Sequence, residues 1–150
     1  MIKIRIGDAF PFIKNGVNIK QERNAEGIPI TRIETLSGGV FQWDRLGYAN
    51  IFNVSNYEEF ILADGDILMS HINSFDYLGR SVVYHENRDV GSVIHGMNLL
   101  RLKVEKSIIL PEYAAYLFRG QTFKESIRKI SKKSVNQASF SVTDLKKINI

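Results

Sequence analysis

The sequence of 150 residues contains no cysteine. A chain without cysteine has no disulfide framework, no thiolate zinc site and no cysteine nucleophile. This composition is compatible with a reducing compartment, and we expect a cytoplasmic protein.

Long apolar runs are missing as well. No stretch approaches the roughly 20 consecutive apolar residues that a membrane-spanning helix needs. Residues 1–6 alternate apolar and charged side chains and lack the apolar core of a signal peptide, so we expect a β-strand there. The sequence therefore predicts a soluble protein with no membrane partner.

Motifs for nucleotide-dependent chemistry are also absent. We find no Gly-rich dinucleotide fingerprint, no P-loop and no Asn-Pro-Pro-Tyr or Asp-Pro-Pro-Tyr motif of amino-methyl transfer. With 44% hydrophobic and 24% charged residues, the chain has the size and apolar content of one globular domain. We expect a single domain over residues 1–150 that is not an enzyme and uses no cofactor.

Positive charge is concentrated at one end of the chain. Residues 119–150 contain eight basic and two acidic side chains, whereas the rest of the chain has a small negative balance. The formal net charge of +4 therefore comes from the last fifth of the sequence. Such a concentration predicts a surface that binds phosphates, although lysines on an amphipathic helix often form only a solvated face.

The order of predicted elements favours an α+β fold. Period-two or β-branched patterns predict strands early and in the middle of the chain, at residues 2–6, 28–33, 67–72, 80–85 and 93–104. A helix is predicted from Pro111, with an interruption at Gly120, and a second follows because Phe123, Ile127 and Ile130 recur at helical spacing. Ser141 and Asp144 are spaced like a helix-capping box.

Short motifs in a fixed order resemble a known family. Residues 4–8 are similar to an opening "L-G-D" strand, 27–33 to "G-I-P-x-I/L-R", 62–70 to "L-x-x-G-D-I-L-x-S" and 78–84 to "I-G-x-x-x-x-Y". Residues 132–150 resemble the end of the same domain, a Gly/Ser-Gln-type loop followed by a capped turn and an "LK-I-I" strand. Together they resemble the target-recognition domain in specificity subunits of type I restriction-modification systems.

The resemblance implies a fold and a function. The fold would be α+β, with a mixed, largely antiparallel twisted sheet or half-barrel and helices packed late in the chain. The domain would recognise one half of a bipartite DNA target and direct a type I methyltransferase and endonuclease complex. Its partners would be double-stranded DNA and, through the parent protein, methyltransferase (M) and restriction (R) subunits. The long spacer helices of full-length subunits are not part of residues 1–150.

Two kinds of DNA contact are expected. Lysine and arginine neutralise phosphates, whereas Asn, Gln and Arg can also pair with base edges. We assign phosphate positioning to four cations of the basic region: Lys124, Arg128, Lys132 and Lys133. Two loop amides could serve either purpose: Asn136 and Gln137. For base reading we select polar residues that we expect to project from loops and strand ends: Arg32, Glu34, Ser70, His71, Asn73 and Arg80.

Several of these polar residues have a simpler structural interpretation. A histidine such as His71 or His95 is more typical of a partly buried structural residue than of a base reader or metal ligand. Arg32 and Glu34 are two residues apart on a predicted strand, so they would share a face and could pair with neighbours.

The loop amides and two aromatic residues also have structural alternatives. Asn136 and Gln137 could satisfy backbone groups in a turn rather than contact DNA. Trp43 and Tyr48 could stack on a base, but such aromatics more often anchor a core or a loop.

A metal-dependent nuclease is the competing interpretation from another class. Asp64, Asp66, His71 and Asp76 lie within a short span, and hard cations favour clustered oxygen ligands. Against this, Asp64 and Asp66 flank Gly65 in a predicted turn, where aspartate is common for backbone reasons. A recognition domain from another DNA methyltransferase system is a second alternative.

Overall fold

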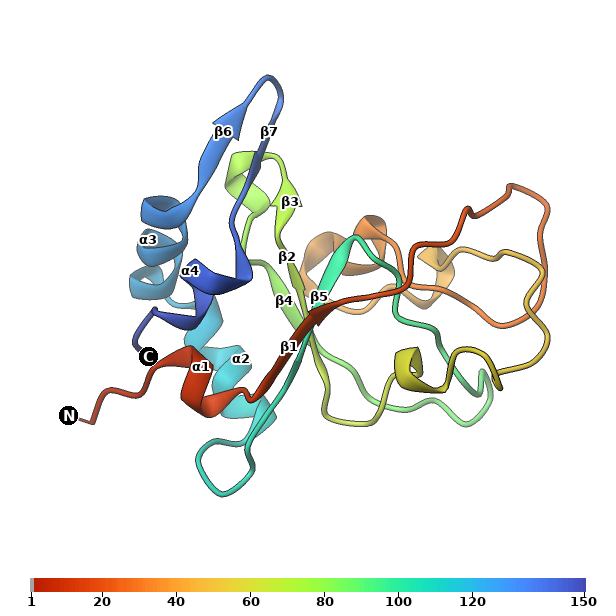
Figure 1. The fold of residues 1–150 in the computed structure, drawn as a ribbon, viewed down its shortest axis with the longest axis horizontal. Coiled ribbons are helices and arrows are strands. Elements are labelled where there is room, and N and C mark those ends of the chain that lie inside the picture. The colour runs from red at the N-terminus through yellow and green to blue at the C-terminus, as the bar shows by residue number, and fades with distance from the viewer. Residues whose placement is uncertain (1) are drawn as a thin grey trace.

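The computed structural model describes residues 2–150 and contains two antiparallel sheets with helices beside them (Figure 1). The larger sheet has the strand order β1-β5-β2-β4, formed by Phe12–Asn15, Leu99–Lys103, Ile67–Ser70 and Ser81–Val83. The smaller has the order β3-β7-β6, formed by Ile72–Asn73, Gln137–Ser139 and Lys132–Ser134. The expected α+β class with antiparallel pairing is confirmed.

Helices α1 to α4 pack beside one face of the larger sheet (Figure 1). They span Ile6–Ala9, Pro111–Arg119, Gln121–Ile130 and Val142–Lys146. Four short 3₁₀ helices, η1 to η4, span Ile33–Gly39, Trp43–Arg45, Glu58–Phe60 and Phe75–Tyr77. In the part of the chain that is described, no helix is both long and apolar enough to cross a membrane.

The larger sheet is buried on both faces. All four residues of β2 and the first four of β5 are buried, and alternate residues of a strand point to opposite sides. Ile67, Met69, Leu100 and Leu102 therefore pack against the helices, while their neighbours Leu68 and Leu99 pack into a second core under η1. Burying each such side chain contributes on the order of 2 kcal/mol, so the sheet is a rigid base for the surrounding loops.

The predicted late helices are confirmed. Pro111 occupies the first turn of α2, where its missing N–H costs nothing, and Gly120 ends α2 and begins α3. Phe123 and Ile127 are the buried residues of α3, as their helical spacing predicts. At α4 the Ser141 hydroxyl accepts a hydrogen bond from the Asp144 backbone N–H at 3.1 Å.

The strand predicted at the N-terminus is wrong. Ile4 and Ile150 exchange two backbone hydrogen bonds of 3.0 and 2.9 Å, but the only β pairing here is an isolated bridge between Arg5 and Asn149. The chain then turns into α1 at Ile6, and this turn buries the apolar Ile6 and Ala9 side chains in the core. The two ends of the chain consequently lie close together (Figure 1).

The strand predicted at residues 28–33 is also wrong. Pro29 has no N–H for a ladder, and only isolated bridges form, from Ile30 to Gly47 and to Ile94. The chain enters η1 at Ile33, where the Thr35 hydroxyl accepts from the Arg32 backbone N–H at 2.8 Å.

Candidate nucleic-acid interface

Basic side chains gather around η4, the short turn that follows β3. The Lys133 Nζ lies 4.1 Å from the Phe75 ring centroid, and the Arg128 guanidinium lies 5.9 Å from the same ring. The Arg80 guanidinium lies 4.3 Å from the Tyr77 ring centroid. Cations over aromatic faces are attracted by the ring quadrupole, so these charges are held in place without being neutralised.

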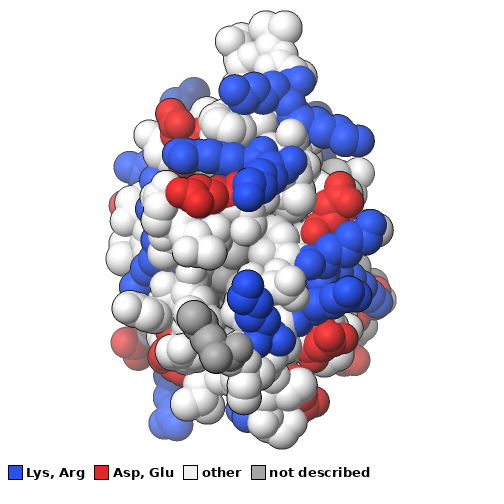
Figure 2. All heavy atoms as spheres, turned by 90° about the vertical axis from the view of Figure 1, so that its left-hand side faces the viewer, with Lys and Arg blue, Asp and Glu red and all other residues white. Residues whose placement is uncertain are grey.

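The local structure of α3 and β6 explains how the cations reach this position. Because Phe123 and Ile127 face the core, Lys124 and Arg128 lie on the outer side of α3 one turn apart. The chain leaves α3 at Ile130 and enters β6, which carries Lys132 and Lys133. All four cations are exposed. Figure 2 shows lysine and arginine side chains gathered in the upper part of this face, beneath the uncharged tip of the β6–β7 turn, with fewer acidic groups between them.

Two shallow depressions meet at Arg80. One, of about 370 Å³, is lined by Glu34, Ser70, Asn73 and Tyr77 as well as Arg80. The other, of about 450 Å³, is lined by Arg80 together with Lys124 and Asp76. Four of the six predicted base-reading residues are therefore brought to one depression, and Arg80 joins it to the depression that Lys124 of α3 lines. We call Arg80, Lys124, Arg128 and Lys133 the η4 cation cluster.

Strands β6 and β7 form a hairpin with Val135 and Asn136 at its turn. Asn136 has φ 65°, a left-handed backbone conformation that asparagine tolerates better than most residues. Asn136 is thus at the loop tip as expected, while the prediction of a loop position for Gln137 is wrong. Gln137 begins β7 and pairs with Ser134 because the turn has only two residues.

Arg32 and Glu34 pair with each other rather than with other neighbours. The Arg32 Nε lies 3.4 Å from the Glu34 Oε2, and both side chains are about half exposed, at 48% and 52%. They lie at the start of η1 and not on a strand. Arg32 lines a further depression of about 570 Å³ with Arg23 and Tyr48, and Glu34 lines both this depression and the one at Arg80.

Ser70 and His71 do not project from the surface, so that expectation is wrong. Both are buried, because β2 passes through the core and the chain emerges only at Ile72. The His71 Nε2 lies 3.0 Å from the Asn15 side-chain Nδ2, and burial lowers the pKa of His71. These contacts favour the structural interpretation of His71.

His95 is a second buried histidine. Its Nε2 lies 2.6 Å from the Leu99 carbonyl oxygen. Burial lowers its pKa to about 4, with a smaller contribution in the same direction from the Arg101 charge, and the Leu99 hydrogen bond opposes the shift. His95 is thus a structural residue of the interior.

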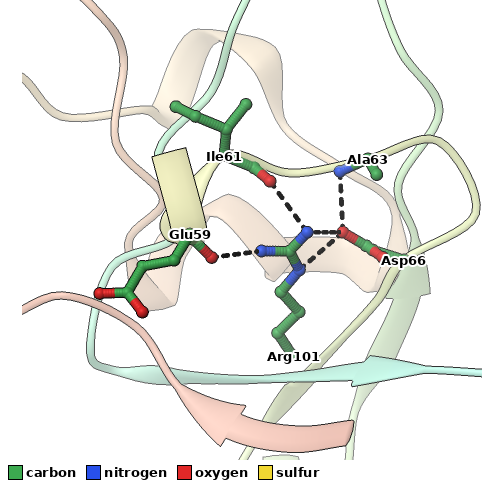
Figure 3. Close-up of polar contacts among 5 residues, drawn as sticks. All are labelled: Glu59, Ile61, Ala63, Asp66 and Arg101. Atoms are coloured by element: carbon green, nitrogen blue, oxygen red, sulfur yellow. Dashed lines mark hydrogen bonds and ion pairs between the residues drawn. The ribbon is translucent and has the colours of Figure 1, made fainter. Parts of the chain in front are cut away.

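The carboxylates proposed for a nuclease do not come together. The buried Asp66 forms an ion pair with Arg101 at 2.6 Å and accepts a hydrogen bond from the Ala63 N–H at 2.8 Å (Figure 3). Asp64 lies beside His85 at 3.5 Å and is not a member of this pair. Across residues 2–150, no group of three or more histidine and acidic side chains is arranged to hold a metal ion. Asp66 therefore has a structural role, because its carboxylate is already paired inside the domain.

Sequence reasoning missed Arg101 and the two aromatics of η4. The Arg101 guanidinium also donates to the backbone oxygens of Glu59 and Ile61, at 3.2 and 2.8 Å, which ties the η3 segment to β5 (Figure 3). A lone arginine inside an apolar strand was the available signal. Phe75 gave no comparable signal because its cations, Arg128 and Lys133, come from a distant part of the chain. Tyr77 lies only three residues from its cation, Arg80, but the sequence does not show that the two side chains are in contact.

Trp43 packs in the second core, as its structural alternative predicts. Its ring centroid lies 4.5 Å from that of Phe41 and 5.9 Å from that of Tyr84. Tyr48, in contrast, lines the depression that contains Arg32.

Comparisons with known proteins point to one family. The family model described as "Type I restriction modification DNA specificity domain" matches residues 2–150. A putative type I restriction enzyme MjaX specificity subunit from Methanocaldococcus jannaschii is 38% identical over 143 residues, which are 95% of this chain and 33% of that protein.

Two solved structures share the fold. The S subunit of a type I restriction-modification system from M. genitalium superposes with a TM-score of 0.62 at 17% identity, covering 99% of this chain and 33% of the other. A chain from a structure of type I system assembly and conformational transition gives a TM-score of 0.66 at 14% identity, with the same coverage. The chain thus spans about a third of the length of these relatives.

The family resemblance of the motifs is confirmed along almost the whole sequence. A DNA specificity domain is a recognition component and not a catalytic one, which agrees with the function expected from the sequence. The chain belongs to the family of type I restriction-modification DNA specificity domains.

Proposed function

We propose that residues 1–150 act as a single target-recognition domain that reads one half of a bipartite DNA sequence. The observation that carries this proposal is the η4 cation cluster, which combines three exposed positive charges and the partly buried Arg80 with a polar depression lined by Arg80. A surface of this kind suits a duplex, because phosphates fix the position of a protein while groove edges carry the sequence information.

Different residues would make the phosphate contacts and the base contacts. Lys124, Arg128, Lys132 and Lys133 lie on exposed outer surfaces, where they are free to neutralise phosphates and release counterions. Asn73 and Arg80 line the depression, and the Arg80 guanidinium suits a guanine edge. The Asn73 amide suits an adenine edge but would have to exchange its contacts with Ser70 and Ser74 for it. Glu34 lines the same depression and could accept a hydrogen bond from a cytosine amino group.

The wider assembly is part of the same proposal. The relatives are about three times as long as this chain, so the parent protein would supply further parts. Within a cytoplasmic restriction-modification complex, this domain would direct M subunits to the target for methylation and the R subunit for cleavage. A single domain buries limited surface on DNA, so we expect its affinity to be modest until other parts of the complex hold the same duplex.

Methylome sequencing tests the proposal directly. Genomic DNA from source cells with and without the gene would be compared for methylated motifs. We expect a bipartite motif that is present only with the gene, together with enrichment of one half of that motif when the 150-residue chain selects duplexes from a random library. Identical methylomes and no enrichment would refute the proposed function.

A further inference from the structure

The β6–β7 hairpin has two unlike faces. Residues paired across antiparallel strands point to the same side, so Lys133 and Ala138 share one face, and Ser134 and Gln137 share the other. Ala138 is only 2% exposed and belongs to the main core, and Lys133 lies over the Phe75 ring. The face of Lys133 and Ala138 therefore packs against the domain itself.

The opposite face is open and polar. Lys132, Ser134 and Gln137 are all exposed on it, and none of them contributes to the depression at Arg80. The Gln137 side-chain amide makes no hydrogen bond with the described residues, and the Ser134 hydroxyl reaches only the Gln137 backbone oxygen at 3.4 Å. A row of uncommitted hydrogen-bonding groups on a projecting hairpin is suited to a polar ligand outside the molecule.

The hairpin is also held rigidly at its root. Strand β7 pairs with β3 as well as with β6, and Phe140, just after β7, is buried and donates its backbone N–H to the His71 oxygen. Beyond this root the turn projects away from the helices (Figure 1). A fixed root and a free tip allow the hairpin to enter a groove without a large loss of conformational entropy.

We propose, on the basis of the proposed function, that the hairpin enters the major groove of DNA tip first and that Gln137 determines specificity by reading an adenine. Two strands about 4.8 Å apart, with their side chains, fit a groove about 12 Å wide but not one about 6 Å wide. Glutamine pairs with the N6 and N7 of adenine through both atoms of its amide. Lys132 and the η4 cation cluster, beside the root of the hairpin, contact the phosphates on either side of the groove.

The experiment compares the chain with Gln137→Ala, Gln137→Glu and a control, Gln121→Ala. Gln121 is exposed at the start of α3, at the end of that helix away from the hairpin. Each protein selects duplexes from a random library, and its affinity for the duplex selected by the unmodified chain is then measured. That duplex is also made with 7-deaza-adenine, which lacks the major-groove N7, or 3-deaza-adenine, which lacks the minor-groove N3, at each adenine in turn.

We expect Gln137→Ala to lose preference at one adenine and to bind that duplex about 10-fold more weakly. Gln137→Glu should shift the base preference at the same position toward cytosine, because a carboxylate can accept a hydrogen bond from the cytosine amino group. Substitution of 7-deaza-adenine at that position should weaken the unmodified chain but have no further effect on Gln137→Ala, and Gln121→Ala should behave like the unmodified chain. A motif unchanged by both Gln137 variants, or sensitivity only to 3-deaza-adenine, would overturn the inference while leaving the proposed function intact. If the unmodified chain selects no sequence, the proposed function fails first.

Discussion

Arg101 carries a charge in the interior of the domain, where a lost partner is costly. Its side chain is 2% exposed and its charge is matched by Asp66. Removing one member of such a pair leaves an uncompensated buried charge, so we expect Arg101→Ala to lower the free energy of unfolding by about 3–5 kcal/mol. Urea denaturation of the 150-residue chain measures this value.

The pair of Arg32 and Glu34 provides the matched control. It joins the same kinds of charge, but both side chains are about half exposed, so solvent screens the interaction. Arg32→Ala should cost no more than about 1 kcal/mol. Equal losses from Arg101→Ala and Arg32→Ala would contradict a structural role for the buried pair.

His95 should make stability dependent on pH. Its pKa is lowered from 6.5 to about 4 in the folded state, so between these values the unfolded chain binds more protons. The stabilisation is therefore complete above pH 6.5 and is lost as the pH falls toward 4. We expect the unmodified chain to lose about 3 kcal/mol more than His95→Gln over this range, measured by urea denaturation at several pH values.

His85 controls for the general effect of losing a histidine. Its side chain is 62% exposed and lies near two carboxylates on the surface. His85→Gln should retain the loss of stability at low pH that we attribute to His95. If His95→Gln also retains that loss, the lowered pKa of His95 does not contribute to acid unfolding.

At the level of single residues, the sequence predicted which side chains could contact DNA chemically better than it predicted which of them are exposed in the fold. The cations of residues 124–133 are exposed as expected, because helical periodicity fixes which side of α3 faces the core. Ser70 and His71 were misplaced because the apolar run of β2 does not show where the strand leaves the core. Arg101 was missed because a buried charge depends on partners such as Asp66, which is 35 residues away along the chain.

Among the elements, those with local signals were predicted and those that depend on distant partners were not. Pro111, Gly120 and Ser141 mark helix boundaries through the chemistry of their own residues, and the structure has boundaries there. Residues 28–33 have β propensity but find separate bridge partners, so no ladder forms. The pairing of β3 with β7 is similarly invisible in the sequence, because 64 or more residues separate the two strands.

The contact between α3 and the link from η4 to β4 can be tested at Gly79. This glycine has φ +77°, and a Cβ there would lie 2.9 Å from the Ile127 Cγ1 and 3.3 Å from the Phe123 Cε1. Gly79→Ala should therefore combine backbone strain with overpacking and push α3 outward, at a cost of about 1–3 kcal/mol beyond the strain alone. Thermal or urea unfolding measures this cost.

Gly91 provides a control that separates backbone strain from overpacking. It has φ +81°, and nothing lies within 4 Å of the position that a Cβ would take. Gly91→Ala should thus show the backbone strain without the overpacking. If Gly79→Ala and Gly91→Ala lower the free energy of unfolding by the same amount, the close contact between Gly79 and α3 does not affect stability.

At the scale of the whole molecule, the fold brings two parts of the sequence to one surface. The basic last fifth supplies Lys124, Arg128 and Lys133, while the middle of the chain supplies Arg80 and the rings of Phe75 and Tyr77. The charge pattern predicted the first contribution, but the second required the tertiary pairing of β3 with β7. The cluster therefore exists only in the folded domain, and a test of its role should compare folded proteins of equal net charge.

Replacing Lys124, Arg128 and Lys133 with alanine removes three positive charges from the η4 cation cluster, and replacing Lys20, Arg88 and Lys106 removes three from exposed positions elsewhere. Both variants have the same net charge, so a nonspecific field effect would weaken them equally. If the cluster contacts phosphates, the slope of log affinity against log salt should fall by about 0.9 per lost contact, or nearly 3 in total, only in the first variant. Fluorescence anisotropy with a labelled duplex at several salt concentrations measures both slopes. Parallel lines for the two variants would show that DNA binds somewhere other than the η4 cation cluster.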